Sequence, residues 1–87
     1  MARMAISADI GFGAQVATPD ALFELGMLYA TGRDVIADLV AAHKWFNIAA
    51  ARGNAEALKR RVEIAREMSG EEIAEAQRQA REWLQSN

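Results

Sequence analysis

Apolar residues recur every three or four positions along four stretches of the chain, a spacing that places them on one face of an α-helix. The stretches are 18–31, 38–52, 54–68 and 69–85. Each begins with a residue that caps a helix N-terminus well, namely Thr18, Asp38, Asn54 or Ser69. Nowhere do apolar and polar residues alternate as they do in a half-buried strand. The pattern therefore predicts an all-α fold.

Short connections limit how these helices pack. Gly32 and Gly53 follow the first two helices, and glycine readily adopts the left-handed backbone in which helices end. One or two residues join the second helix to the third and the third to the fourth. Helices joined so tightly run antiparallel. We therefore expect two antiparallel helical hairpins in a single domain over 18–87.

The periodicity also predicts which faces are buried. In the second helix the expected core residues are Ala41, Ala42, Trp45, Ala49 and Ala50, with Phe46 beside them. In the third they are Leu58, Val62, Ala65 and Met68. In the fourth they are Ile73, Ala76, Ala80, Trp83 and Leu84.

The first helix differs because it is apolar on most of its circumference. Only Asp20 and Glu24 clearly prefer water. Such a helix is expected at the centre of a fold, with other elements on several sides. Gly26 inside it costs about 1 kcal/mol relative to alanine. We expect this glycine to admit a close approach by the alanine-rich second helix.

The segment 1–17 forms an N-terminal arm whose apolar residues are separated by glycines. Those residues are Ile6, Ile10, Phe12 and Val16. Three arrangements stay open for the arm. It folds back over the first helix, it pairs with a second copy of the chain, or it is flexible.

Composition excludes several classes of function. The 87 residues include no cysteine and one histidine, so neither a disulfide framework nor a thiol-based zinc site is expected. The net charge is −2, which gives no strong attraction to nucleic acid or to a membrane surface. No apolar run is long enough to span a bilayer, and the start of the chain lacks a signal-peptide pattern. We expect a cytoplasmic protein.

Candidate chemical groups favour structural roles. The basic run 59–61 has Glu56 and Glu63 at helical spacing, and these glutamates are expected to neutralise it. His43 has no serine or cysteine nucleophile near it in the sequence, so we expect a surface or edge histidine. The glutamates 71, 72 and 75 occupy a helix N-terminus, where the dipole favours negative charge. Trp45 and Trp83 are expected to anchor the core. We therefore predict no enzyme activity, no cofactor and no metal site.

From position 21 to 58 the sequence resembles one repeat of the Sel-one-like family, relatives of the tetratricopeptide repeats. The matching residues are Ala21, Leu25, Gly26, Tyr29, Gly32, Val35, Asp38, Ala42, Trp45, Ala49, Ala50, Gly53, Ala57 and Leu58. The resemblance implies a helix-turn-helix hairpin stacked on its neighbour. It also implies a non-catalytic adaptor that binds other proteins.

The sequence departs from the family pattern in three ways. Asp34 stands where a second loop glycine is usual, although aspartate tolerates left-handed backbone better than most residues. The third helix begins like a new repeat but continues with the basic run 59–61, so we interpret the last two helices as a terminal cap. With one complete repeat, the opposite face of the first helix is expected to stay uncovered.

The resemblance places four residues of the first helix on the groove where related repeats bind peptides. They are Asp20, Phe23, Met27 and Ala30. The alternative is that Phe23 and Met27 pack within the fold. The leading hypothesis is a protein-interaction module whose partner is a peptide, a helix or a second copy of the chain. The alternative function is a small nucleic-acid-binding regulator of helix-turn-helix type, which the acidic charge balance disfavours.

Overall fold

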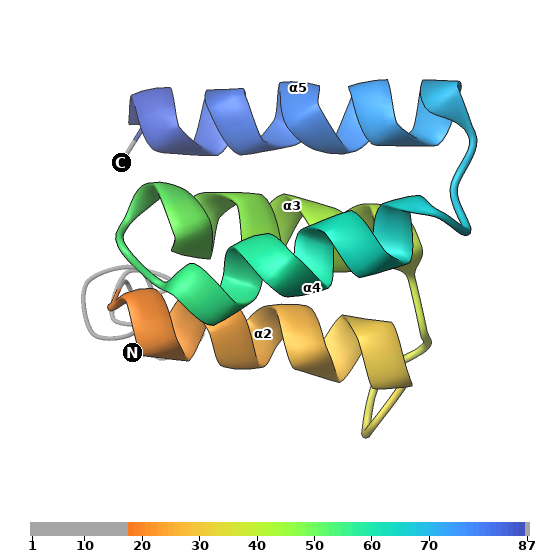
Figure 1. Ribbon diagram of the computed structural model, residues 1–87, viewed down its shortest axis with the longest axis horizontal. Helices are drawn as coiled ribbons and strands as arrows, with labels where there is room; N and C mark the ends of the chain where they lie inside the picture. Colours follow the sequence, from red (N-terminus) through yellow and green to blue (C-terminus); the bar gives the residue numbers. More distant parts are fainter. Residues whose placement is uncertain (1–17, 87) are drawn as a thin grey trace, which may run out of the picture.

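The computed structural model describes residues 18–86, so the N-terminal arm and its three expected arrangements lie outside the described residues. Within this range the chain forms four helices and no strand, which confirms the all-α class. The helices are α2 (Pro19–Thr31), α3 (Leu39–Ala51), α4 (Ala55–Ala65) and α5 (Gly70–Ser86) (Figure 1). The third helix ends earlier than predicted, at Ala65 rather than Met68.

All four predicted caps form. The side chains of Thr18, Asp38 and Asn54 each accept a hydrogen bond from the backbone N–H three residues on, at 3.1, 3.1 and 2.8 Å. Ser69 Oγ accepts from the N–H of Glu72 at 3.1 Å, and Glu72 Oε1 accepts from the N–H of Ser69 at 2.8 Å. Each bond satisfies an N–H group that a helix leaves without an internal partner. The helix starts are therefore encoded locally.

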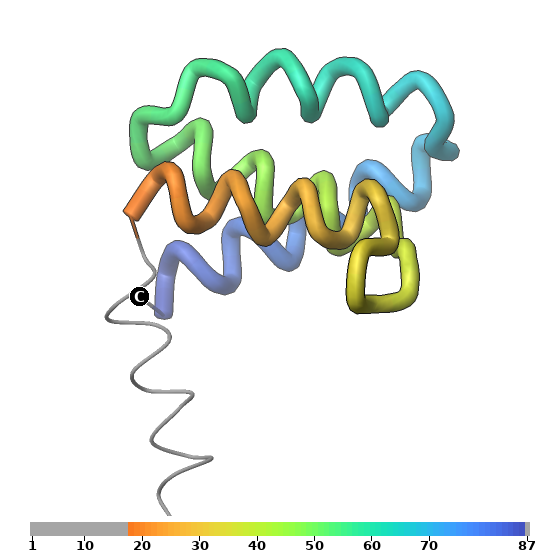
Figure 2. Tube along the Cα trace, turned by 90° about the horizontal axis from the view of Figure 1, so that it is seen from below, coloured from red at the N-terminus to blue at the C-terminus, as the bar shows by residue number. Residues whose placement is uncertain are grey.

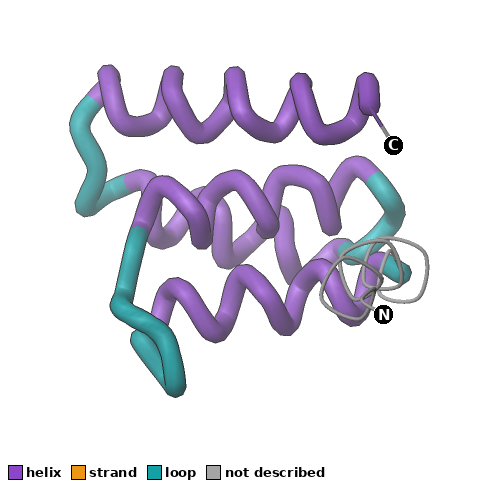
Figure 3. Tube along the Cα trace, turned by 180° about the vertical axis from the view of Figure 1, so that it is seen from behind, coloured by secondary structure: helices purple, strands orange, loops and turns teal. Residues whose placement is uncertain are grey.

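The loop between α2 and α3 turns the chain back on itself (Figure 3). Gly32 ends α2 in left-handed backbone, with φ 74°, and its N–H donates to the carbonyl of Leu28 at 2.9 Å. Asp34 is also left-handed, with φ 65°. The N–H of Asp38 then donates to the carbonyl of Tyr29 at 3.0 Å. This bond brings the start of α3 back against the end of α2.

The helix at the centre of the fold is α3. It contacts α2, α4 and α5, whereas α2 contacts mainly α3 (Figures 1 and 2). The prediction that the first helix is central is therefore wrong. The runs of alanine in α3 explain the difference, because small side chains let three helices approach one backbone. The apolar surface of α2 is therefore covered by α3 on one side and partly exposed on another.

Phe46 fills the space between α2 and α3. Its side chain is fully buried, along with Leu22 and Ile48. A Cβ added at Gly26 would overlap the Phe46 ring, with Cγ 3.1 Å away and two further ring carbons closer. Gly26 therefore makes room for an aromatic ring and not for the alanine face that the sequence suggested.

Helix α4 presents a different face to the core from the one predicted. Ala57 is fully buried and Ile64 packs against the core, while Leu58 and Val62 are 46% and 47% exposed. The reason is the position of α5, which runs antiparallel to α4 but packs against α3 (Figure 1). The side of α4 that carries Leu58 and Val62 is consequently left open. The expected core residues of α5, by contrast, do face α3, with Ala76 and Ala80 buried.

Candidate functional site

The four predicted partner-binding residues lie on α2 in two different settings. Phe23 packs inward, with its ring centroid 5.7 Å from that of Phe46 in a tilted arrangement. Met27 and Ala30 touch the core cluster and stay partly exposed. We refer to Asp20, Phe23, Met27 and Ala30 as the α2 face. Phe23 is therefore held by its contact with Phe46, although it is partly exposed like Met27 and Ala30.

Asp20 connects the α2 face to the next helix pair. Its side chain is exposed, and Oδ1 accepts a hydrogen bond from Asn54 Nδ2 at 3.0 Å. Asn54 also caps α4 through its Oδ1 atom, which leaves its amide nitrogen free for Asp20. One asparagine therefore joins the starts of α2 and α4 and holds these helices side by side at that end.

His43 is buried, with 2% of its surface exposed, so the prediction of a surface or edge histidine is wrong. It lies on α3, which is enclosed by neighbours on three sides. Burial lowers the pKa of His43, the positive charge of Arg61 lowers it further, and a contact with its own backbone offsets part of the shift. Arg61 comes from α4, where its Nη1 donates to Asn47 Oδ1 of α3 at 3.2 Å. His43 is therefore a neutral packing residue beside a polar tie between two helices.

The prediction that glutamates neutralise the basic run on α4 holds for Arg60 alone among its three cations. Arg60 lies 3.3 Å from Glu56 and 3.5 Å from Glu63. The expected pair of Lys59 with Glu63 is not formed, because Glu63 is engaged by Arg60. Arg61 turns inward to Asn47. No continuous basic stripe results on this part of the chain.

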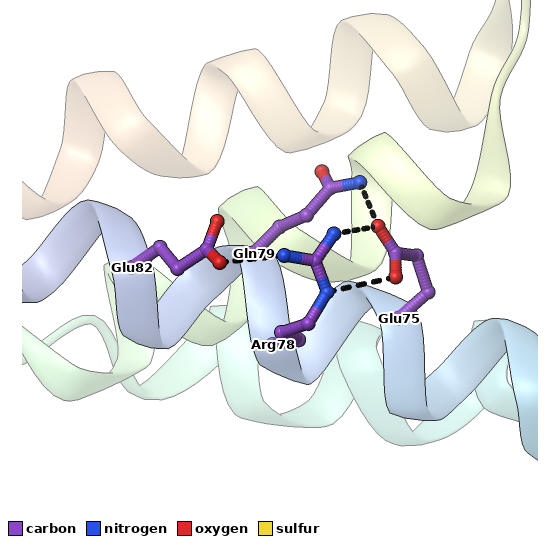
Figure 4. Close-up of polar contacts among 4 residues, drawn as sticks. All are labelled: Glu75, Arg78, Gln79 and Glu82. Carbon is purple, nitrogen blue, oxygen red and sulfur yellow. Dashed lines mark hydrogen bonds and ion pairs between the residues drawn. The ribbon is translucent and has the colours of Figure 1, made fainter.

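The glutamates of α5 act as caps and surface partners. Glu72 closes the capping box, and Glu75 takes both a bidentate contact from Arg78 and a bond from Gln79 at 2.8 Å (Figure 4). Hydrogen bonds from Arg78 and then Gln79 lower the pKa of Glu75 to about 2. Arg78 also reaches Glu82 on the next turn. Glu75 is therefore held ionised at the surface, and these glutamates serve as caps and ion-pair partners and not as an acid–base pair.

Between α3 and α5 lies a stack of rings and cations that the sequence did not predict. The Trp45 and Trp83 rings meet edge to face at 5.7 Å. Lys44 Nζ lies 4.5 Å from the Trp45 centroid, and the Arg52 guanidinium lies 5.3 Å from the Trp83 centroid. Both tryptophans pack against the core, as predicted. The residues were visible in the sequence, but their pairing depends on where α5 docks.

An open pocket of about 480 Å³ adjoins this stack. It is lined by Lys44, Arg78, Gln79, Glu82, Trp83 and Ser86. Burial lowers the pKa of Lys44, while the carboxylate of Glu82 acts in the opposite direction. Because Arg78 is already held by Glu75 and Glu82, the lining offers no free pair of cations for an anionic ligand.

The described residues offer helix surfaces suited to binding and not a cluster of chemically reactive groups. Residues 18–86 contain no group of three or more side chains placed to hold a metal ion. In the same range, no helix has the length and apolar character needed to cross a bilayer. What the arrangement offers is helix surface with partly exposed apolar side chains, which suits contact with another protein.

Comparison with known protein families supports this assignment. The model of the Sel1 repeat matches residues 19–54 and 68–86. The first match spans α2, the loop and α3, and the second covers α5. Neither the search of curated proteins nor that of solved structures gave a match. Sel1 repeats are helical repeats that generally mediate protein–protein interaction and are typically non-enzymatic. This chain, with its helical hairpin and its paired family matches, belongs to the Sel1 repeat family.

Proposed function

We propose that this protein is a non-enzymatic interaction module that binds a peptide or helix of a partner protein through the α2 face. The observation that carries the proposal is the state of Met27 and Ala30. Both stay partly exposed, as Phe23 does, on a helix whose main neighbour is α3. Methionine adapts well to varied apolar partners. The Phe23 ring is already held against Phe46, which limits the ordering cost on binding.

Helix α4 adds charge beside this apolar surface. The first family match, residues 19–54, spans 36 residues, so the residues of α4 that correspond to the α2 face lie 36 positions later in the chain. All four of them are exposed and charged. They are Glu56, Lys59, Glu63 and Arg66. Because α2 and α4 contact each other, a ligand on the α2 face would also meet α4. The proposed ligand therefore carries an apolar anchor for Met27 with polar or charged residues beside it, a buried centre with a polar rim.

The structure gives less support to nucleic acid as the partner. A nucleic-acid interface requires several uncompensated cations on one face. On α4, Arg60 is paired with two glutamates and Arg61 is bonded to Asn47. With a net charge of −2 over the whole sequence, the electrostatic contribution to such binding is small.

Selection of peptides from a random display library on the immobilised protein tests the proposal. Selected peptides are then measured against Met27→Glu and Ala30→Glu, with Ala74→Glu as the matched control. Ala74 is exposed on α5, so its variant adds the same side chain away from the α2 face. We expect the first two variants to weaken binding at least about tenfold, which corresponds to 1.4 kcal/mol. Equal binding by all three variants would refute the proposed site.

A further inference from the structure

Helix α4 shows how a helix of this chain docks on its neighbour. Ala57 is fully buried and Ile64 packs against the core, so these positions form the contact of α4 with the body of the fold. The residues 36 positions earlier are Ala21 and Leu28 on α2. Both are partly exposed, and neither belongs to the core cluster. Ala57 and Ile64 thus dock α4 onto the fold. The corresponding residues of α2, Ala21 and Leu28, are left without such a packing partner among residues 18–86.

We call this outer side of α2 the head surface and define it by Ala21, Glu24 and Leu28. The three residues lie three and four positions apart, so they share one side of the helix. Glu24 is exposed and, within residues 18–86, forms no ion pair. The head surface is thus a small apolar strip with a negative charge.

The other end of the stack carries a surface of opposite charge. On α4, Leu58 and Val62 lie one turn apart and are 46% and 47% exposed. Lys59 and Arg66 flank them, both exposed and both outside the ion pairs found among the described residues. We call these four residues the tail surface. It is an apolar strip beside two positive charges. The neighbouring Glu63 is also exposed, but Arg60 engages it.

We infer that the head surface of one copy of this chain docks on the tail surface of a second copy, head to tail. The occupant is argued from charge complementarity. Glu24 of the head surface is acidic, whereas Lys59 and Arg66 of the tail surface are cations outside the ion pairs found among residues 18–86. Contact between a head and a tail therefore pairs opposite charges beside buried apolar side chains.

The same charges disfavour a symmetric dimer. A contact between two head surfaces would bring Glu24 of one copy towards Glu24 of the other. A contact between two tail surfaces would bring together the cations Lys59 and Arg66 of both copies. Like charges placed across an interface oppose association. A head-to-tail contact joins different surfaces, so it does not close at two copies and continues as concentration rises. The head surface lies on a different side of α2 from the α2 face. In the tail surface, Lys59 and Arg66 also belong to the charged side of α4 that the proposed ligand meets, whereas Leu58 and Val62 do not.

Blocked-end variants test the inference. The head-blocked variant is Glu24→Lys with Leu28→Lys, which keeps its tail. The tail-blocked variant is Leu58→Lys with Val62→Lys, which keeps its head. In sedimentation velocity over a wide concentration range, we expect the wild-type mass to rise beyond that of a dimer. Each blocked variant alone stays monomeric, and an equimolar mixture forms a heterodimer and nothing larger.

The other outcomes overturn the inference. A wild-type chain that stays monomeric, or that stops at a dimer, contradicts head-to-tail association, as does a mixture that stays monomeric. Circular dichroism checks that each variant is helical. If a lysine pair prevents folding, Lys59→Glu with Arg66→Glu takes its place, because these side chains are exposed and unpaired in the described residues. That variant should associate at least about tenfold more weakly, and mixing it with Glu24→Lys should restore association. Met27→Glu, on the α2 face, should leave the mass unchanged, which separates this test from that of the proposed function.

Discussion

Replacing Gly26 with alanine tests the packing of α2 on α3. In an ordinary helix interior the change stabilises by about 1 kcal/mol, because glycine loses more backbone freedom on folding. Here the new methyl group would overlap three atoms of the Phe46 ring. The ring is fully buried and lies against Phe23, so it has little room to move.

The size of the effect follows from these two contributions. Overpacking a well-filled core costs about 1–3 kcal/mol, and overlap with a fixed ring belongs in the upper part of that range. After the gain in helix propensity, we expect Gly26→Ala to destabilise the fold by about 1–2 kcal/mol. For a domain of this size each kcal/mol lowers the melting temperature by about 4–8 °C. Thermal and urea unfolding followed by circular dichroism measure the change.

A Phe46→Leu chain separates the effect of the steric overlap from that of helix propensity. In a Phe46→Leu chain the overlapping ring is gone, so the same Gly26→Ala change should become neutral or stabilising by up to about 1 kcal/mol. Gly70→Ala is the control, because an added Cβ there meets nothing within 4 Å. A higher melting temperature for Gly26→Ala in the wild-type background would show that Phe46 does not occupy this space.

Three further predictions follow from single residues. Because the pKa of His43 is lowered in the fold, the unfolded chain takes up the proton first as the pH falls, so the stability is full above about pH 6.5 and is lost below it. His43→Gln should flatten this dependence in urea midpoints measured from about pH 7.5 to about pH 5. Asp34→Gly should raise the melting temperature and stabilise the fold by up to about 1 kcal/mol, because glycine adopts φ 65° without steric strain. A lower melting temperature would contradict the left-handed backbone at this position. Glu75→Gln should leave the urea midpoint at pH 7 unchanged, although the carboxylate is strongly held, because the pair with Arg78 is exposed; a clear drop would show that this network is structural.

Local signals in the sequence predicted the helices well because their causes lie within a few residues. Each cap bonds a backbone group three positions away, and Gly32 ends α2 through its own dihedral angle. The same holds for the capping box of Ser69 and Glu72. Such features need no knowledge of the tertiary fold.

Features set by distant helices were predicted less well. The position of α5 against α3 decides that α3 is central and that Leu58 and Val62 are open, and no pattern within α4 encodes it. His43 is buried on α3, which contacts three other helices, and the pattern within α3 alone does not show this. For Phe23 the sequence left two settings open, a binding groove and the interior of the fold, and its contact with Phe46 could be identified only in three dimensions. Partner binding by this face stays a prediction.

The proposed binding of a partner at the α2 face can be tested by chemical-shift mapping of the isotope-labelled protein with a selected peptide. We expect the largest shifts at Met27, Ala30 and Asp20, with smaller ones on the charged side of α4. Shifts confined to the pocket between α3 and α5, around Lys44 and Trp83, would contradict it.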